Sequence, residues 1–172
     1  YPDIYTAQIF SSAFGGGMSS RLFQEVREKR GLCYSIFASA GAYCDTGTMT
    51  LYAGTSGDKL ADLAHITVDE LKRAAEDMSE VEVARARAQM KAGMLMGLES
   101  PSARAERLAR MISIWDRIPV LDEVVAQIDA VSVEAVRGYA GAMSDGAPAA
   151  MALYGPVSDA PDIATLQARL VA

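Results

Sequence analysis

The chain has 172 residues, a formal net charge of −6 and 51% hydrophobic residues. This length suits one ordinary domain with a buried core, and the hydrophobic content excludes a disordered chain. The acidic balance argues against a nucleic-acid surface, which needs a concentrated basic patch, and no apolar run reaches the about eighteen residues that a membrane-spanning helix requires.

The first predicted elements are two helices joined by three glycines. Asp3 can cap the first helix, which the glycines at 15–17 end. Three consecutive glycines are expected where the backbone needs a positive φ or where another backbone approaches closely. The second helix runs from residue 19 or 20 to Arg30, with Gly31 placed where a left-handed residue belongs. Its apolar stripe consists of Leu22, Phe23 and Val26.

Two strands with a two-residue period follow these helices. Residues 33–42 and 48–55 alternate between two sets of side chains, as the two faces of a strand require. The sequence Asp-Thr-Gly at 45–47 is turn chemistry, so the two strands are predicted to form an antiparallel hairpin. The hairpin would begin at Tyr34 and hold that residue on a rigid element.

The middle of the chain is predicted to be helical. Asp58 can cap a segment with one buried face over residues 60–75, and a capping box of Ser79 and Glu82 opens a long helix to about residue 98. Ser100 and Pro101 then start a further helix, and shorter helices are expected at 122–128 and 132–143. The residues expected to face inward from the helix after Pro101 are Leu108, Met111, Ile112 and Trp115.

The C-terminal part is predicted to contain a buried strand from Pro148 to Tyr154, closed by Gly155 and Pro156, and a last helix at about 163–170. A few strands among many helices indicate the α+β class, with a layer of helices on an antiparallel or mixed sheet.

The run from Gly15 to Ser35 combines the glycines, a charged amphipathic segment, Arg27 and Tyr34. A phosphate cradle at the glycines is disfavoured, because the Walker pattern requires Gly-Lys-Ser/Thr and the dinucleotide pattern requires a preceding strand. An arginine in so charged a helix is most often a solvated residue, and a tyrosine at the start of a strand is most often a core residue. The residues alone leave both alternatives open.

The chain offers few metal ligands. Cys33 and Cys44 lie on either side of a predicted strand, permit neither a zinc cluster nor a disulfide framework, and are expected to be reduced, buried thiols. The single histidine, His65, lies in a helical pattern, and one histidine cannot build a zinc site. We therefore predict no metal site and no cofactor in this chain.

The stretch from Gly15 to Tyr34 resembles the C-terminal, non-zinc half of the pitrilysin-type zinc peptidases, most closely the mitochondrial processing peptidase and its bacterial homologues. The resemblance continues through residues 43–47 and the following strand, and the helical pattern fits the same domain to near the C-terminus. In that family an arginine and a tyrosine seven positions apart reach toward the zinc centre of the other half. The matching residues here are Arg27 and Tyr34.

The resemblance implies roles for these residues. Tyr34 would donate to the scissile carbonyl oxygen, and Arg27 would anchor substrate carbonyl groups. The glycines Gly15, Gly16 and Gly17 would form a turn beside the peptide channel. Because the family's His-x-x-Glu-His motif is absent, this chain would be inactive alone and would complete the site of an upstream domain or partner subunit that holds the zinc.

The same resemblance leaves an alternative function, a non-catalytic scaffold or core subunit with no proteolytic role. Family domains open with one or two strands before the first helix, so we expect residues 1–172 to be a single C-terminal domain truncated at its N-terminus. The sheet edge left unpaired would favour a dimer. We expect a peptide substrate, no nucleic-acid or membrane partner, and a cytoplasmic location.

Overall fold

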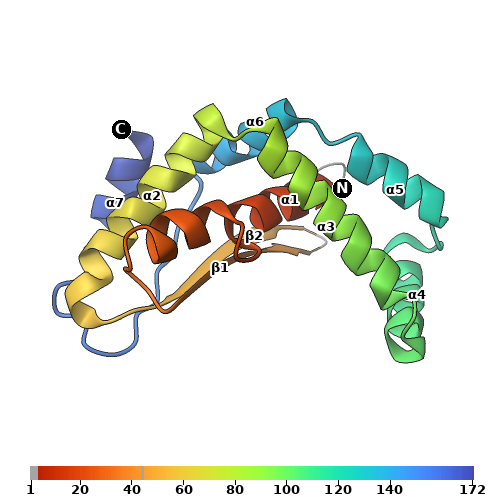
Figure 1. Ribbon diagram of the computed structural model, residues 1–172, viewed down its shortest axis with the longest axis horizontal. Coiled ribbons are helices and arrows are strands. Elements are labelled where there is room, and N and C mark those ends of the chain that lie inside the picture. Colours follow the sequence, from red (N-terminus) through yellow and green to blue (C-terminus); the bar gives the residue numbers. More distant parts are fainter. Residues whose placement is uncertain (1–3, 44) are drawn as a thin grey trace.

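The computed structural model describes residues 4–43 and 45–172, and Figure 1 shows a helix-rich α+β fold. Asp3 and Cys44, predicted as a helix cap and a buried thiol, lie outside the described residues. The elements in chain order are α1 (Ile4–Gly15), η1 (Phe23–Glu28), β1 (Ser35–Ala42), β2 (Gly47–Gly54), η2 (Gly57–Lys59), α2 (Leu60–Asp77), α3 (Glu80–Gly97), α4 (Pro101–Trp115), α5 (Leu121–Asp129), α6 (Val133–Ser144) and α7 (Ile163–Val171).

Strands β1 and β2 form the predicted antiparallel hairpin. The register pairs Ser35 with Gly54 at the open end and Ala42 with Gly47 at the turn. At the turn, the N–H of Tyr43 donates to the carbonyl oxygen of Thr46 at 2.9 Å. The alternation of side chains therefore predicted the strands, and the turn chemistry at 45–47 predicted their pairing.

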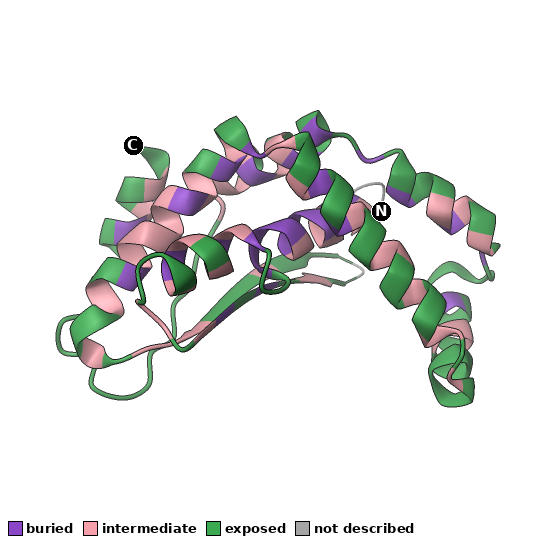
Figure 2. Ribbon diagram, viewed as in Figure 1, coloured by how far each residue is buried: buried purple, intermediate pink, exposed green. Residues whose placement is uncertain are grey.

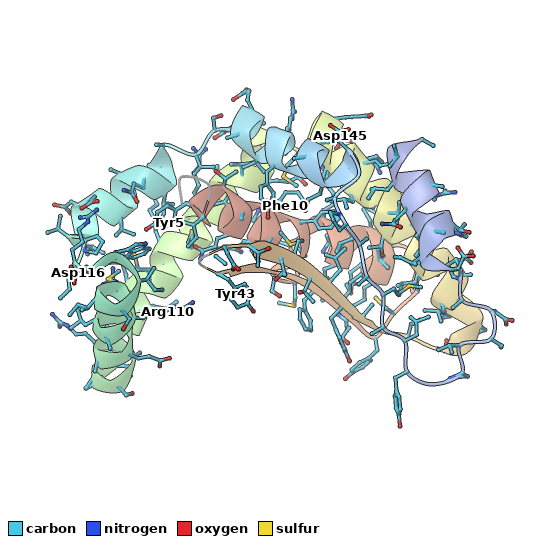
Figure 3. The ribbon with its side chains drawn as sticks, turned by 180° about the vertical axis from the view of Figure 1, so that it is seen from behind. Tyr5, Phe10, Tyr43, Arg110, Asp116 and Asp145 are labelled. Carbon is cyan, nitrogen blue, oxygen red and sulfur yellow. The ribbon has the colours of Figure 1, made fainter. Side chains whose placement is uncertain are left out.

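Helix α1 lies between the hairpin and the other helices (Figure 1), and its buried and half-buried residues are purple and pink in Figure 2. It packs against β1 on one side and against α3 and α6 on the other. Phe10 and Phe14 are fully buried, and their ring centroids lie 5.1 Å apart. The ring of Phe10, which is labelled in Figure 3, also lies 5.6 Å from that of Tyr139 on α6. A helix apolar on so many sides is a core helix, not a surface one.

Capping residues set the helix starts largely as predicted. Ser79 and Glu82 form the expected capping box at the start of α3, and Ser100 and Ser132 accept hydrogen bonds at the starts of α4 and α6. Asp58 does not cap α2. It lies inside η2, a short 3-10 helix that directly precedes α2, and Lys59 occupies the N-cap position of α2 instead.

Helix α4 extends away from the rest of the fold (Figure 1). Of the four residues predicted to face inward, Met111 is buried and Leu108 is half-buried, but Ile112 and Trp115 are 51% and 37% exposed. The prediction for these two is wrong because other described elements make only sparse contacts with α4. Asp116 ends the helix in the left-handed conformation, with φ of 54° (Figure 3).

The predicted strand from Pro148 to Tyr154 is also wrong. These residues are exposed and form no regular element. A strand needs a neighbour for its backbone groups, and within the described residues the hairpin is the only sheet, its two strands paired with each other alone. The last predicted helix, in contrast, is present as α7.

Candidate functional site

The three glycines after α1 have different surroundings. A Cβ on Gly15 would lie 2.5 Å from the backbone nitrogen of Ala38, and one on Gly16 would lie 2.6 Å from the Cα of Ser12. Gly17 is exposed and faces open space. None of the three has a positive φ. Close backbone approach thus explains Gly15, which is buried on β1, and the alternative of a positive φ is wrong.

The second predicted helix is present but carries a π-helix. The chain becomes helical at Arg21, and η1 follows from Phe23 to Glu28. The N–H of Lys29 donates to the carbonyl oxygen of Gln24 at 3.0 Å, five residues back. Gly31 has the predicted left-handed conformation, with φ of 60°. Short π-helical turns are rare and occur frequently at functional sites.

The inner side of η1 and its connection to β1 are both fixed. Val26 is fully buried, and its carbonyl oxygen accepts from the N–H of Leu32 at 3.0 Å. Lys59 donates through Nζ to the carbonyl oxygen of Gly31 at 2.8 Å, and Thr55 donates through Oγ1 to that of Leu32 at 2.5 Å. The segment from η1 to the hairpin is therefore held by the chain that links β2 to α2.

Arg27 lies on the accessible side of η1. Its guanidinium carbon is 4.5 Å from the centroid of the Phe23 ring, a cation–π distance, and one guanidinium nitrogen is 3.4 Å from Glu28. The side chain is 34% exposed. Burial raises the pKa of the nearby Cys33 thiol, and the positive charge of Arg27 partly opposes this effect. Cys33 is a free thiol, half-buried.

Arg30, the other arginine near the end of this helical segment, is already engaged. Its Nη1 donates to the Glu25 carboxylate at 2.9 Å and to the Glu25 backbone oxygen at 2.7 Å. Hydrogen bonds from Lys29 and Arg30 lower the pKa of Glu25. They outweigh burial, which acts in the opposite direction. Of the two arginines, Arg27 is therefore the one with weaker internal contacts.

Tyr34 stands at the start of the hairpin with its side chain in solvent. Its backbone N–H donates to the carbonyl oxygen of Gly54 at 2.8 Å, which fixes the main chain. The side chain is among the most exposed large side chains of the described residues, at 85%. Its hydroxyl makes no hydrogen bond with another described residue. The alternative that Tyr34 is a core residue is thus wrong.

Arg27 and Tyr34 both lie near the open end of the hairpin. The backbone oxygen of Arg27 accepts from the N–H of Gly31 at 2.9 Å, and the N–H of Tyr34 donates to Gly54 at that end. Each of the two side chains carries N–H or O–H groups that can donate to a carbonyl oxygen.

Comparison with known proteins identifies the family. The family model described as the peptidase M16 inactive domain matches residues 1–90, which is more than half of the chain. The chain belongs to this family. The resemblance seen in the run from Gly15 to Tyr34 is therefore confirmed.

Relatives of this M16 domain include two bacterial proteins, each named an uncharacterized zinc protease. The one from Streptomyces coelicolor is 36% identical over 152 residues, which cover 88% of this chain and 33% of the relative. The one from Bacillus subtilis, YmxG, is 34% identical over 140 residues, which cover 80% of this chain and 34% of the relative. The M16 domain thus spans about a third of the length of these relatives.

Solved structures share the fold. A chain of Complex III2 from Candida albicans with Inz-5 bound matches with a TM-score of 0.73 and 24% identity, over 83% of this chain and 36% of its own length. A protease from Helicobacter pylori matches with a TM-score of 0.67 and 21% identity, over 83% and 34%. These likenesses confirm the α+β fold class of the M16 domain.

The M16 domain does not present a zinc centre in the part of the chain that the structure describes. No group of three or more His, Cys, Asp or Glu side chains is placed there to hold a metal ion, and His65 is half-buried on α2. The residues present therefore do not fit a catalytic zinc site, which takes three protein ligands. Within the same residues, no helix combines the length and the apolar character needed to cross a membrane.

Two charged residues near η1 were not predicted from the sequence. Glu70 of α2 is 2% exposed; its Oε1 accepts from Arg73 at 2.8 Å, while its Oε2 is buried with no hydrogen-bond partner among the described residues. Burial, reinforced by the charge of Glu25, raises the pKa of Glu70. Arg21, just before η1, has a side chain only 9% exposed. The three-residue spacing between Glu70 and Arg73, which places both on one face of a helix, was the sequence pattern that could have identified Glu70.

Proposed function

We propose that this chain is the substrate-binding half of a zinc-dependent endopeptidase and that Arg27 and Tyr34 contact the peptide. The observation that carries the proposal is Tyr34, an exposed phenol on a backbone that the hairpin fixes, whose hydroxyl makes no hydrogen bond within the described residues. Donors held in place before the reaction stabilise developing negative charge better than mobile ones, because no reorganisation is needed.

The two side chains suit different tasks. The Arg27 guanidinium keeps its charge at working pH and presents several N–H groups, so it can hold substrate carbonyl oxygens in the ground state. The Tyr34 hydroxyl can donate to the scissile carbonyl oxygen as negative charge develops there. A zinc ion held outside this chain would polarise the same bond. Gly16 and Gly17, exposed in the turn after α1, would border the peptide, and Gly15 would shape that turn.

The zinc would belong to an upstream domain or a partner subunit, and this chain alone would be inactive. Support comes from relatives that are named zinc proteases and of which the matched part makes up only about a third. A second support is the sheet, because within the described residues each strand of the hairpin has one unpaired edge. Such edges recruit strands from partners, here from the zinc-binding half or, in the isolated chain, from a second copy.

The first test replaces Tyr34 in the intact protein, meaning the longer protein to which we assign this domain. Tyr34→Phe removes only the hydroxyl, and we expect kcat on a peptide to fall about 100- to 1,000-fold, as for loss of an oxyanion donor. Tyr154→Phe is the control, since Tyr154 is fully exposed in the loop after α6. Zinc content should be unchanged in both variants.

The second test replaces Arg27. Arg27→Ala should raise KM about tenfold, the effect of losing roughly 1.4 kcal/mol of substrate binding, and Arg27→Lys should recover part of the loss. Arg110→Ala is the control, because Arg110 is exposed on α4 (Figure 3). Parental kinetics in both Tyr34→Phe and Arg27→Ala would contradict the proposal. A protein without any peptidase activity would favour the scaffold function instead.

A further inference from the structure

Arg21 connects the start of the π-helix to the corner between α2 and α3. Its Nε and Nη2 donate to the two carboxylate oxygens of Glu82, each at 3.0 Å, and its Nη1 pairs with Asp77. These contacts bridge 61 and 56 residues of sequence. A bidentate arginine–carboxylate pair fixes orientation as well as distance, because two parallel hydrogen bonds must both be kept.

The acceptors of Arg21 are themselves held in place. The Oε2 of Glu82 also accepts from the backbone N–H and the hydroxyl of Ser79, both at 2.8 Å. Asp77 receives a further hydrogen bond from Arg73 at 3.3 Å. Burial disfavours the charge of Glu82, but hydrogen bonds from Arg21 and Ser79 outweigh this and lower its pKa. We call the set Arg21, Asp77 and Glu82 the arginine clamp.

A second arginine holds the chain just before the clamp. Arg85 of α3 donates through Nη1 to the carbonyl oxygen of Ser19 at 2.8 Å. Leu22, the residue after Arg21, is fully buried. The chain entering η1 is thus fixed from α3 and from the core, whereas Arg27 has only Phe23 and Glu28 as partners within its own element.

We infer that the arginine clamp is a positioning device for Arg27 in the function proposed above. In η1 the backbone donates to the carbonyl five residues back, and a change to four would turn every later side chain to a new direction. Arg27 lies six residues after Arg21. A fixed Arg21 therefore selects the register of η1 and with it the direction of the Arg27 guanidinium.

A purely stabilising ion pair is the competing explanation, and the chain contains a matched control for it. Arg169 of α7 donates to both oxygens of Asp69 on α2, each at 2.7 Å, in the same bidentate geometry. This pair joins α7 to α2, and its hydrogen bonds run only between Arg169 and Asp69, so none of them reaches η1. Loss of either pair removes one bidentate contact, but only loss of the arginine clamp should affect Arg27.

The test measures peptide kinetics of the intact protein with Arg21→Gln, Arg169→Gln, Arg27→Ala and the double variant Arg21→Gln/Arg27→Ala. We expect Arg21→Gln to raise KM about tenfold, Arg169→Gln to match the parent, and the double variant to match Arg27→Ala within about twofold, since residues that act as a unit are not additive. Arg21→Lys, which keeps the charge but loses the fork, should recover only part of the affinity. If Arg21→Gln does not fold, Asp77→Asn at the half-exposed end of the clamp replaces it.

The outcomes separate the two proposals. Parental kinetics in Arg21→Gln, or an undiminished effect of Arg21→Gln in the Arg27→Ala background, would overturn the positioning role. If Arg27→Ala alone has parental kinetics, the substrate contact proposed for Arg27 fails, and hydrogen exchange then tests the clamp by itself. The amide of Lys29, bonded to Gln24, should lose protection in Arg21→Gln and keep it in Arg169→Gln. Equal protection in the two variants would refute the clamp.

Discussion

Helices α1 and α4 both carry large apolar side chains, yet these side chains have opposite environments. In α1, Ile9, Phe10 and Phe14 are fully buried, whereas in α4, Ile112 and Ile114 are more than half exposed. The difference is also visible as purple and green in Figure 2. Helix α1 has the hairpin on one side and α3 and α6 on the other, while α4 has no comparable neighbour in the described residues. Apolar composition makes a helix able to join a core, but burial requires surfaces on more than one side.

The largest expected difference between these helices is in their contribution to stability. Phe10→Ala should lower the free energy of unfolding by about 3–5 kcal/mol, since it opens a cavity in the core. Ile112→Ala should change it by less than about 0.5 kcal/mol, as for other exposed positions. Urea denaturation of the domain measures both. A large loss in Ile112→Ala would show that α4 is buried in solution, for example in a dimer.

The glycine turn gives a second contrast, now within one region. Gly15→Ala places a methyl group 2.5 Å from the backbone of Ala38, so we expect a loss of about 1–3 kcal/mol, the usual result of overpacking. Gly17→Ala meets no atom within 4 Å and should be neutral within about 0.5 kcal/mol. Thermal unfolding of the two variants provides the comparison, and equal melting temperatures would contradict the close packing of α1 on β1.

Helix caps should show the same contrast on a smaller scale. Ser79→Ala removes the cap of α3 and a hydrogen bond to Glu82, and should cost about 1 kcal/mol. Ser100→Ala should cost less, because its contact with the N–H of Ala103 is long, at 3.4 Å, and lies on the exposed α4. Urea denaturation that ranks the two variants the other way would show that α4 is the better-anchored helix.

The smallest effect concerns pH. Because burial raises the folded-state pKa of Glu70 above its unfolded value, the native state binds this proton more tightly, and stability falls as pH rises through that interval. Glu70→Gln removes this penalty, so its stability relative to the parent should increase from pH 4 to pH 7.

Glu82, whose pKa is lowered, should show the opposite trend. Its stabilisation is present at neutral pH and is lost as pH falls through the lowered pKa, so Glu82→Gln should be most harmful at neutral pH. Unfolding curves at several pH values measure whether the stability of each variant, relative to the parent, rises or falls with pH.

Local sequence signals predicted the elements whose partners lie close by. The capping box at Ser79, the turn at 45–47 and the left-handed Gly31 depend on neighbouring residues, and all are present. Gly15 was singled out correctly, although only the structure shows that Ala38 is the reason.

Features that depend on distant residues could not be predicted. Residues 148–154 have the pattern of a strand but no neighbour in the described residues to pair with. The π-helical register of η1 is tied to Glu82, which lies 61 residues beyond Arg21. The burial of Glu70 likewise depends on the packing of other elements, distant in sequence, against α2. Of the candidate site, the positions of Arg27 and Tyr34 followed from the family pattern, but their exposure did not.

The span of the arginine clamp has a consequence for synthesis of the protein. Arg21 leaves the ribosome long before Glu82, and about sixty further residues must emerge before the Arg21 guanidinium can bind the Glu82 carboxylate. Closing so long a loop carries an entropic cost that is repaid only when α2 and α3 have docked. We therefore expect the segment that presents Arg27 to order on the nascent chain only after α2 and the start of α3 have emerged. The chain would gain its affinity for peptide no earlier than that, which protects the unfinished protein from premature contacts with other unfolded chains.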